Sequence, residues 1–190
     1  MNDWQESVRM LEEWQQIVLG AALVSRMAPN YALFCEVSDS GDSRVFNAIL
    51  DVVWEFARGD NTRIHFDKQQ DKLEAITPDP ARFDVYGVWP ALDATVALAS
   101  LLGACERFSS DDIIAIATVS QSTISHFLEA SGADHQQSQH PLLAADSQFC
   151  QQLVQRLKRA DTAERRQVAT ATRQWVAGFE HSNIGLQNAD

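Results

Sequence analysis

The chain has 190 residues, of which 45% are hydrophobic and 22% are charged, and its formal net charge is −11 at pH 7. This length predicts one domain, residues 1–190, with a core that buries roughly 70% of the surface of the unfolded chain. The negative charge argues against partners such as nucleic acid or an anionic membrane surface.

The first third of the chain has the apolar spacing of helices. Trp4, Val8 and Leu11 begin a three-to-four-residue repeat that predicts one amphipathic helix over residues 4–27. Pro29 is expected to end that helix, because proline cannot continue the backbone hydrogen-bond ladder. A short separate helix is then expected over residues 31–37.

Two further helices are predicted before residue 77. The first covers residues 44–58 and is followed by Gly59, where a left-handed cap is expected. Asp67 and Gln70 have the spacing of a capping box, which predicts a helix through residue 76. The TPDP sequence at 77–80 then breaks the pattern.

The remaining helices follow proline, serine and aspartate signals. Pro90 begins a helix to about residue 107, and this helix should form the centre of the fold because residues 94–105 are apolar on every face. Ser109 caps the next helix, which ends near residue 132. After a polar loop at 134–141, two last helices are expected over residues 143–159 and 162–179. The prediction is an all-α protein: a compact, mostly antiparallel up-and-down bundle of six to eight helices.

The cysteines and the termini predict a cytoplasmic location. Cys35, Cys105 and Cys150 are odd in number and widely spaced, which is typical of reduced, buried thiols. The first residues lack the basic start of a signal peptide. The longest uncharged runs, such as residues 94–105, are shorter than the ~20 residues of a membrane-spanning helix.

No motif in the sequence identifies a reaction. Phosphate-binding glycine loops, a nucleophile elbow, a Cys-x-x-Cys pair and the Glu-x-x-His pattern of di-iron bundles are all absent from the sequence. His135, His140 and Asp134 could form a weak metal site, but solvated loop histidines are the preferred interpretation. We therefore expect no cofactor and no bound metal.

Two groups of acidic residues allow either a structural or a functional interpretation. Asp51 and Glu55 lie one helical turn apart, either on a solvated face relieved by nearby arginines or as an acidic pair for a cationic ligand or acid–base chemistry. Asp93 either stabilises the first turn of its helix or becomes a functional group if it is buried beside that pair. Asp84 and Tyr86 precede the same helix and are otherwise turn residues.

The positive charge is concentrated near the end of the chain, where residues 156–173 carry six bases and two acids. No aromatic residues alternate with these bases, so a nucleic-acid surface is the less favoured explanation. Docking onto the acidic remainder of the chain, or onto a second acidic subunit, is physically simpler.

Four stretches resemble a known family. They are RMAPNYALFC at 26–35, LDVVWE at 50–55, FDVYGVWPALD at 83–93 and SNIG at 182–185. In this order they are similar to the YjaG-like family, a bacterial family named for a domain of unknown function, number 416. The resemblance implies a helical cytoplasmic protein with no established activity, and it transfers no catalytic residue.

The resemblance selects polar residues within those stretches as a candidate ligand or interaction site. They are Asn30, Tyr31, Asp51, Glu55, Asp84, Tyr86, Asp93 and Asn183. The leading hypothesis is a non-enzymatic helical protein that acts through self-association, as a homo-oligomer, or through a protein partner. The alternative is an enzyme or small-ligand-binding protein with an acidic pocket.

Overall fold

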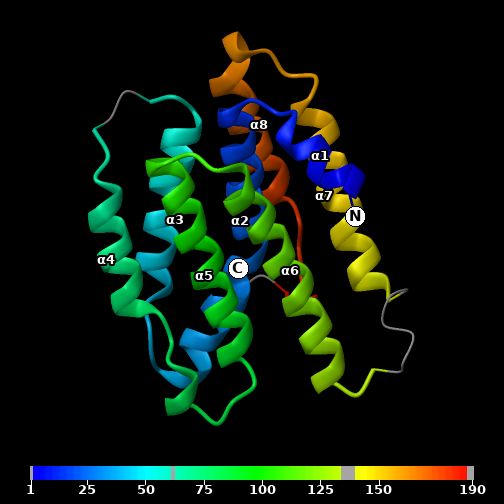
Figure 1. Cartoon of the computed structure of the whole chain (residues 1–190). Helices are drawn as coiled ribbons and strands as arrows, with labels where there is room; N and C mark the ends of the chain where they lie inside the picture. Colours follow the sequence, from blue (N-terminus) through cyan, green and yellow to red (C-terminus); the bar gives the residue numbers. More distant parts are fainter. Residues whose placement is uncertain (1, 61–62, 134–139, 188–190) are drawn as a thin grey trace.

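Eight α-helices form the part of the chain that the computed structural model describes, which is residues 2–60, 63–133 and 140–187. They are α1 (Asn2–Arg9), α2 (Glu13–Ser38), α3 (Ser43–Ala57), α4 (Phe66–Ile76), α5 (Val88–Glu106), α6 (Ser110–Ala130), α7 (Pro141–Leu157) and α8 (Arg165–Ala177). Single 3₁₀ turns, η1 (Pro80–Arg82) and η3 (Thr162–Glu164), precede α5 and α8. From α2 to α8, successive helices run in alternating directions (Figure 1). The predicted all-α, up-and-down bundle is confirmed.

The capping residues explain where several helices start. The Asp42 side chain accepts hydrogen bonds from the backbone N–H groups of Arg44 and Val45 at 2.9 and 3.1 Å, which fixes the start of α3. Ser109 caps α6, as the sequence predicts, by accepting from the N–H of Asp112. The predicted cap of α4 is wrong, because the residue before its first turn is His65 and Asp67 lies inside the helix.

The N-terminal helix predicted over residues 4–27 is instead two helices. A break at residues 10–12 separates α1 from α2, and the backbone N–H of Glu12 donates to Oε1 of Gln15 at 2.9 Å, as in a capping box. The apolar spacing continues across this break, so periodicity alone could not reveal it. The Glu-x-x-Gln pair at 12–15 was the available signal.

Pro29 does not end α2, which continues to Ser38 and includes the separate helix predicted at 31–37. Proline within a helix removes one donor and opens the preceding turn, which leaves backbone carbonyls without helical partners. In this turn, where Pro29 removes the donor for the carbonyl of Ser25, the carbonyl of Arg26 accepts from the backbone N–H of Asn183 at 3.2 Å. The segment that follows α8 therefore supplies a hydrogen bond at the turn that proline disturbs.

The helix at the centre of the bundle is α2, rather than the predicted helix α5. It packs against α3, α5, α6, α7 and α8, whereas α5 exposes Trp89 and Val96 on its outer side. Both helices are long and apolar enough to span a membrane by length and composition, but 72% of the apolar window of α2 and 61% of that of α5 is buried inside the bundle. Packing within the bundle accounts for that hydrophobicity.

Two clusters of hydrophobic side chains form the core. The large one draws on every helix from α1 to α8 and includes Leu19, Trp54 and Leu98. The small one consists of Ile124, Leu128 and Ile184, and it lies where the segment after α8 meets α6. The three cysteines are free thiols, with Cys105 and Cys150 buried.

Candidate functional site

An apolar groove lies at the end of the bundle where α2 finishes. We call it the end groove; it is lined by Asn30, Leu33, Phe34, Val37, Val85, Tyr86, Gly87, Pro90, Phe127, Ile184 and Leu186. These residues come from α2, the connection into α5, α6 and the segment after α8. The cavity volume is about 260 Å³, and its surface is almost entirely apolar.

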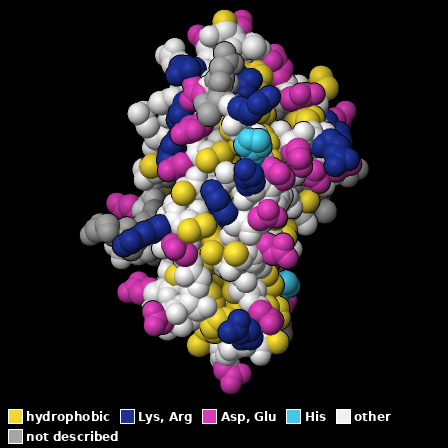
Figure 2. All heavy atoms as spheres, turned by 90° about the vertical axis from the view of Figure 1, so that its left-hand side faces the viewer, with side chains coloured by type: hydrophobic (Ala, Val, Ile, Leu, Met, Phe, Trp, Pro, Cys, Tyr) yellow, Lys and Arg dark blue, Asp and Glu magenta, His cyan; other side chains and the backbone are white. Residues whose placement is uncertain are grey.

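Exposed hydrophobic side chains concentrate around the end groove. Within the described residues, seven large hydrophobic side chains are exposed: Met10, Leu33, Val37, Val85, Tyr86, Trp89 and Val96. Four of them line the groove, and Trp89 and Val96 follow from Tyr86 along one outer face of α5. Figure 2, which views the molecule from the left-hand side of Figure 1, shows hydrophobic side chains gathered towards the lower end, with acidic and basic side chains around them.

On the α5 side, the groove is lined by the ring of Tyr86, and the carboxylate of Asp93 lies close enough to affect that residue. The rings of Tyr86 and Phe127 lie 6.2 Å apart. Burial, followed by the negative charges of Asp93 and Glu129, raises the pKa of Tyr86. Asp93 accepts a hydrogen bond from the Thr123 hydroxyl at 2.7 Å, and burial raises its pKa, although that hydrogen bond and the nearby His126 oppose the shift.

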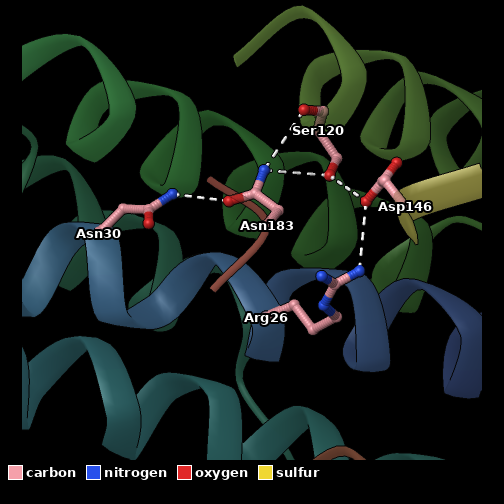
Figure 3. Close-up of polar contacts among 5 residues, drawn as sticks. All are labelled: Arg26, Asn30, Ser120, Asp146 and Asn183. Atoms are coloured by element: carbon pink, nitrogen blue, oxygen red, sulfur yellow. Dashed lines mark hydrogen bonds and ion pairs between the residues drawn. The ribbon is translucent and has the colours of Figure 1, made fainter. Parts of the chain in front are cut away.

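A buried polar network lies next to the groove (Figure 3); it consists of Arg26, Asn30, Ser120, Asp146 and Asn183. Asn30 Nδ2 donates to Asn183 Oδ1 at 2.8 Å, and Asn183 Nδ2 donates to the Ser120 hydroxyl at 3.1 Å. The Ser120 hydroxyl donates to Asp146 Oδ1 at 3.1 Å, and Arg26 Nη1 lies 3.4 Å from the same oxygen. The network connects α2, α6 and α7 through a residue that follows α8.

Arg26 and Asp146 form a buried ion pair with weak geometry. The guanidinium carbon of Arg26 lies 4.5 Å from the ring centre of Phe149 and 5.6 Å from that of Phe179. Burial lowers the pKa of Arg26 and raises that of Asp146, and each partner's charge opposes the shift of the other. Since desolvation offsets much of the attraction in such a pair, the aromatic rings and Ser120 contribute to holding both charges in the core.

Asn30 joins the network to the groove. Its side chain is 2% exposed, and it lines the groove while its amide nitrogen bonds to Asn183. Among the described residues, no donor reaches the Oδ1 atom of Asn30. This oxygen is therefore a buried acceptor with unused hydrogen-bonding capacity.

The structure brings together Asn30 and Asn183, and it places Tyr86 and Asp93 at the same end of the bundle. Tyr31 is bonded to the backbone of other elements. Its hydroxyl donates to the carbonyl of Ile76 at 2.7 Å and accepts from the N–H of Asp42 at 3.2 Å. Its ring stacks on Phe46 with centres 4.9 Å apart, and burial raises the pKa of its hydroxyl. Tyr31 thus ties the start of α3 and the end of α4 to the central helix.

The predicted acidic residues do not share a cavity. Asp51 pairs with Arg173 of α8, and the shallow cavity that both line includes none of Glu55, Asp84 or Asp93. Glu55 is half-buried on α3, and Asp84 is exposed in the connection into α5. Arg44 and Arg58 are the arginines expected to relieve the charge of Asp51; Arg58 pairs with Asp60 instead.

The basic segment docks onto the acidic part of the chain. Arg165 donates to the carbonyls of Ala57 and Phe56 at 2.8 and 2.7 Å, which caps the end of α3. Arg166 pairs with Asp60 at 2.5 Å, and Arg173 pairs with Asp51. The positive charge of α8 is thus used partly within the molecule.

Of the loop residues considered for a weak metal site, and preferred as solvated histidines, only His140 falls within the described residues. Asp134 and His135 lie outside the described residues, and the His140 ring accepts from the N–H of Leu142 at the start of α7. In the part of the chain that the structure describes, no three His, Cys, Asp or Glu side chains converge.

Several residues of the site were not predicted from the sequence. Arg26 is a lone charge in the apolar run of residues 17–27, and Asp146 follows an apolar turn of α7; each isolated charge was a usable signal of a buried pair. The groove residues Leu33 and Val37 gave no comparable signal, since their spacing is that of ordinary core positions.

Comparison with known proteins places the chain in a family. The model of the family described as "Protein of unknown function (DUF416)" matches residues 3–187. An uncharacterised protein of Haemophilus influenzae is 38% identical over 140 residues, which cover 72% of this chain and 71% of that protein. The Escherichia coli protein YjaG is 40% identical over 114 residues, which cover 60% of this chain and only 57% of YjaG.

A solved structure gives the same result for the fold. The crystal structure of a DUF416 family protein from Shewanella baltica is 29% identical in sequence and superposes with a TM-score of 0.88, covering 96% of this chain and 97% of that one. Since the family model spans almost the whole chain and the fold agrees, this protein belongs to the DUF416 family, whose function is unknown.

Proposed function

We propose that this chain is a protein-binding module whose partner inserts apolar side chains into the end groove. One observation carries the proposal: four of the seven large exposed hydrophobic side chains in the described residues, Leu33, Val37, Val85 and Tyr86, line this groove. Scattered exposed hydrophobic residues are normal on a soluble protein, but a contiguous patch around a concave surface is typical of an interaction site.

The size and chemistry of the groove support a protein partner over a catalytic pocket. Its volume of about 260 Å³ is below the roughly 300–1,000 Å³ of sites for drug-sized ligands. Tyr86, which lines the groove, and Asp93, whose charge acts on Tyr86, both have raised pKa values. An enzyme or small-ligand protein with an acidic pocket would also need Asp51, which faces Arg173.

We further propose that the module works in the cytoplasm, without nucleic acid, membrane or cofactor. The formal charge of −11 would be repelled by phosphate backbones and anionic lipids. Three arginines near the end of the chain also disfavour a nucleic-acid partner. Arg165, Arg166 and Arg173 contact carbonyl and carboxylate groups within the molecule, so they are less available to phosphate groups.

The proposal is tested by a double substitution in the groove with a matched control elsewhere. Leu33→Asp/Val37→Asp places two charges in the groove at positions that are already exposed, so the bundle should still fold. Met10→Asp is the control, because Met10 is 77% exposed and belongs to the break between α1 and α2. Native mass spectrometry of tagged chains purified from the host checks which complexes form.

The expected result is that the unmodified chain and the Met10→Asp control retain the same complex, whereas the groove variant is recovered as a monomer. A monomer for all three chains would contradict the proposal. A bound metabolite that the groove variant loses would replace the protein partner with a small ligand.

A further inference from the structure

Building on the proposed binding function, we propose that the end groove recognises a tryptophan side chain of a different protein, in a segment flanked by lysine or arginine. Two independent features of the groove carry this identification. The first is the unused acceptor on Asn30, and the second is the acidic character of the surrounding rim.

The acceptor is matched by a donor on the occupant. Asn30 lines a groove with an almost entirely apolar surface, and within the described chain its buried Oδ1 receives no hydrogen bond. An occupant that is purely apolar would leave this oxygen without any partner, at the cost of a desolvated polar atom. An indole ring combines the largest apolar side chain with a single N–H donor and no acceptor, so it matches both properties.

The neighbours of Asn30 fix its side chain in this role. Its amide nitrogen donates to Asn183 Oδ1 at 2.8 Å, and Asn183 in turn donates to Ser120. Reversing the amide of Asn30 would place two oxygens against each other at that contact. The acceptor of Asn30 is therefore held available by the buried polar network.

The rim selects the charge of the segment around the tryptophan. The segments that supply groove residues, 33–39, 82–96 and 126–129, carry five carboxylates, Glu36, Asp39, Asp84, Asp93 and Glu129, and one arginine, Arg82. One further arginine, Arg44, shares a neighbouring cavity with Glu36 and Asp39, so acidic groups still outnumber basic ones here. Asp93 and Glu129 are close enough to Tyr86 to contribute to its raised pKa. A partner with lysine or arginine beside the anchor would be attracted to this rim.

The same charges disfavour a second copy of this chain as the occupant. A symmetric contact through the groove would bring each acidic rim against its own duplicate. Like charges at an interface select against that pairing, so the observations favour a different, basic partner.

The test uses short capped peptides and indole probes on the intact protein. One peptide carries a single tryptophan among apolar residues flanked by lysines, and a second replaces those lysines by glutamates. We expect the lysine peptide to bind at least about tenfold more tightly, with the difference shrinking as salt is added. Glu36→Gln/Asp84→Asn, both at exposed positions, should reduce that preference.

The acceptor is tested without altering the fold, by titrating the unmodified protein with indole and with 1-methylindole. Indole should bind about three- to tenfold more tightly, because only indole can donate to Asn30. Chemical shifts of the groove residues Leu33 and Tyr86 locate the probe. Asn30→Leu should remove the difference between the two probes if that variant folds.

Each failure has a separate meaning. Equal binding of the two probes in the groove would overturn the assignment of the Asn30 acceptor. Equal binding of the two peptides, or a homodimer that Leu33→Asp/Val37→Asp disrupts, would overturn the basic partner. If the host complex depends on the groove but no tryptophan peptide binds, the identity of the anchor fails while the proposed binding function stands.

Discussion

Burial shifts the pKa values of a few polar residues, and the shift of Asp93 can be tested by its effect on stability. It is half-buried on α5, it accepts a hydrogen bond from Thr123, and burial raises its pKa. The folded chain therefore keeps the proton at pH values where the unfolded chain has already lost it. The stabilisation from this group is complete below the ordinary aspartate pKa of about 3.9 and is lost as the pH rises through the higher folded value.

Asp93→Asn should flatten this part of the pH dependence and raise the free energy of unfolding at neutral pH, since asparagine can still accept from Thr123 without a buried charge. Urea unfolding of the unmodified and substituted chains between about pH 4 and pH 7 measures the difference. Asp84→Asn, at an exposed aspartate, is the control. An Asp93→Asn difference that stays constant across this range would contradict the raised pKa.

Residue-level prediction from the sequence succeeded where one local signal decided the outcome. Ser109 and Gly59 have the conformations that their residue types favour: Ser109 caps α6, and Gly59 adopts a φ of +76°. Asp51 and Asp93 could not be placed, because their partners Arg173 and Thr123 are distant in sequence. Which face of a helix meets which neighbour is a property of the tertiary packing.

At the scale of elements, two neighbouring arginines at the start of α8 contact α3 and the residues after it in different ways, one partly buried and one exposed to solvent. Arg165 reaches the last carbonyls of α3 from a partly buried position, and burial lowers its pKa. Arg166 is the neighbouring residue, but its side chain is 71% exposed in its pair with Asp60. The Phe56 carbonyl also accepts from the backbone N–H of Gly59, so Arg165 adds a charged donor to the last carbonyls of α3. Such a partly buried charged donor contributes more than an ion pair in solvent.

Arg165→Met should therefore lower the free energy of unfolding by about 1.5–3 kcal/mol. Arg166→Met, the matched control on the same helix, should cost less than about 1 kcal/mol, and added salt should reduce that small loss further. Chemical denaturation of both variants measures the two values. Equal losses would show that the carbonyl cap of α3 contributes no more than the exposed pair.

The two prolines Pro29 and Pro90 differ in how well they predict helix boundaries. The sequence predicts a helix end at Pro29 and a first helical turn at Pro90. Only the second prediction is correct, because Pro90 lies in the first turn of α5, which begins at Val88. At Pro29 the apolar faces on both sides of the proline are buried in the same core, so packing outweighs the lost hydrogen bond. The backbone N–H of Asn183, which bonds the carbonyl of Arg26, could not be foreseen from the local sequence.

At the scale of the whole molecule, Asn183 joins helices that are far apart in sequence. It is 1% exposed, and its side chain bonds to Asn30 on α2 and to Ser120 on α6. Asn183→Ala leaves the buried Asn30 amide without an acceptor and removes a donor from Ser120, which keeps its bond to Asp146. The loss should be about 2–3 kcal/mol. Asn47→Ala, at an exposed position of α3, should change stability by no more than about 0.5 kcal/mol.

Thermal or urea unfolding checks both asparagine variants. A loss for Asn183→Ala as small as that of the control would mean that water or a rearranged side chain replaces the missing amide. The double-mutant cycle with Asn30→Ala then measures how much of the loss comes from the direct contact of the two asparagines.

The buried polar network also constrains the order in which the molecule can be completed during synthesis. Asn30 and Asn183 are separated by 153 positions, so at about 5–20 residues per second the second asparagine is made roughly 8–30 s after the first. Throughout that interval α2 has no Asn183 to bond its Arg26 carbonyl or its Asn30 amide. The central helix is thus the first long helix to be made and among the last to be fully bonded, which gives chaperones a defined period in which to bind the nascent chain.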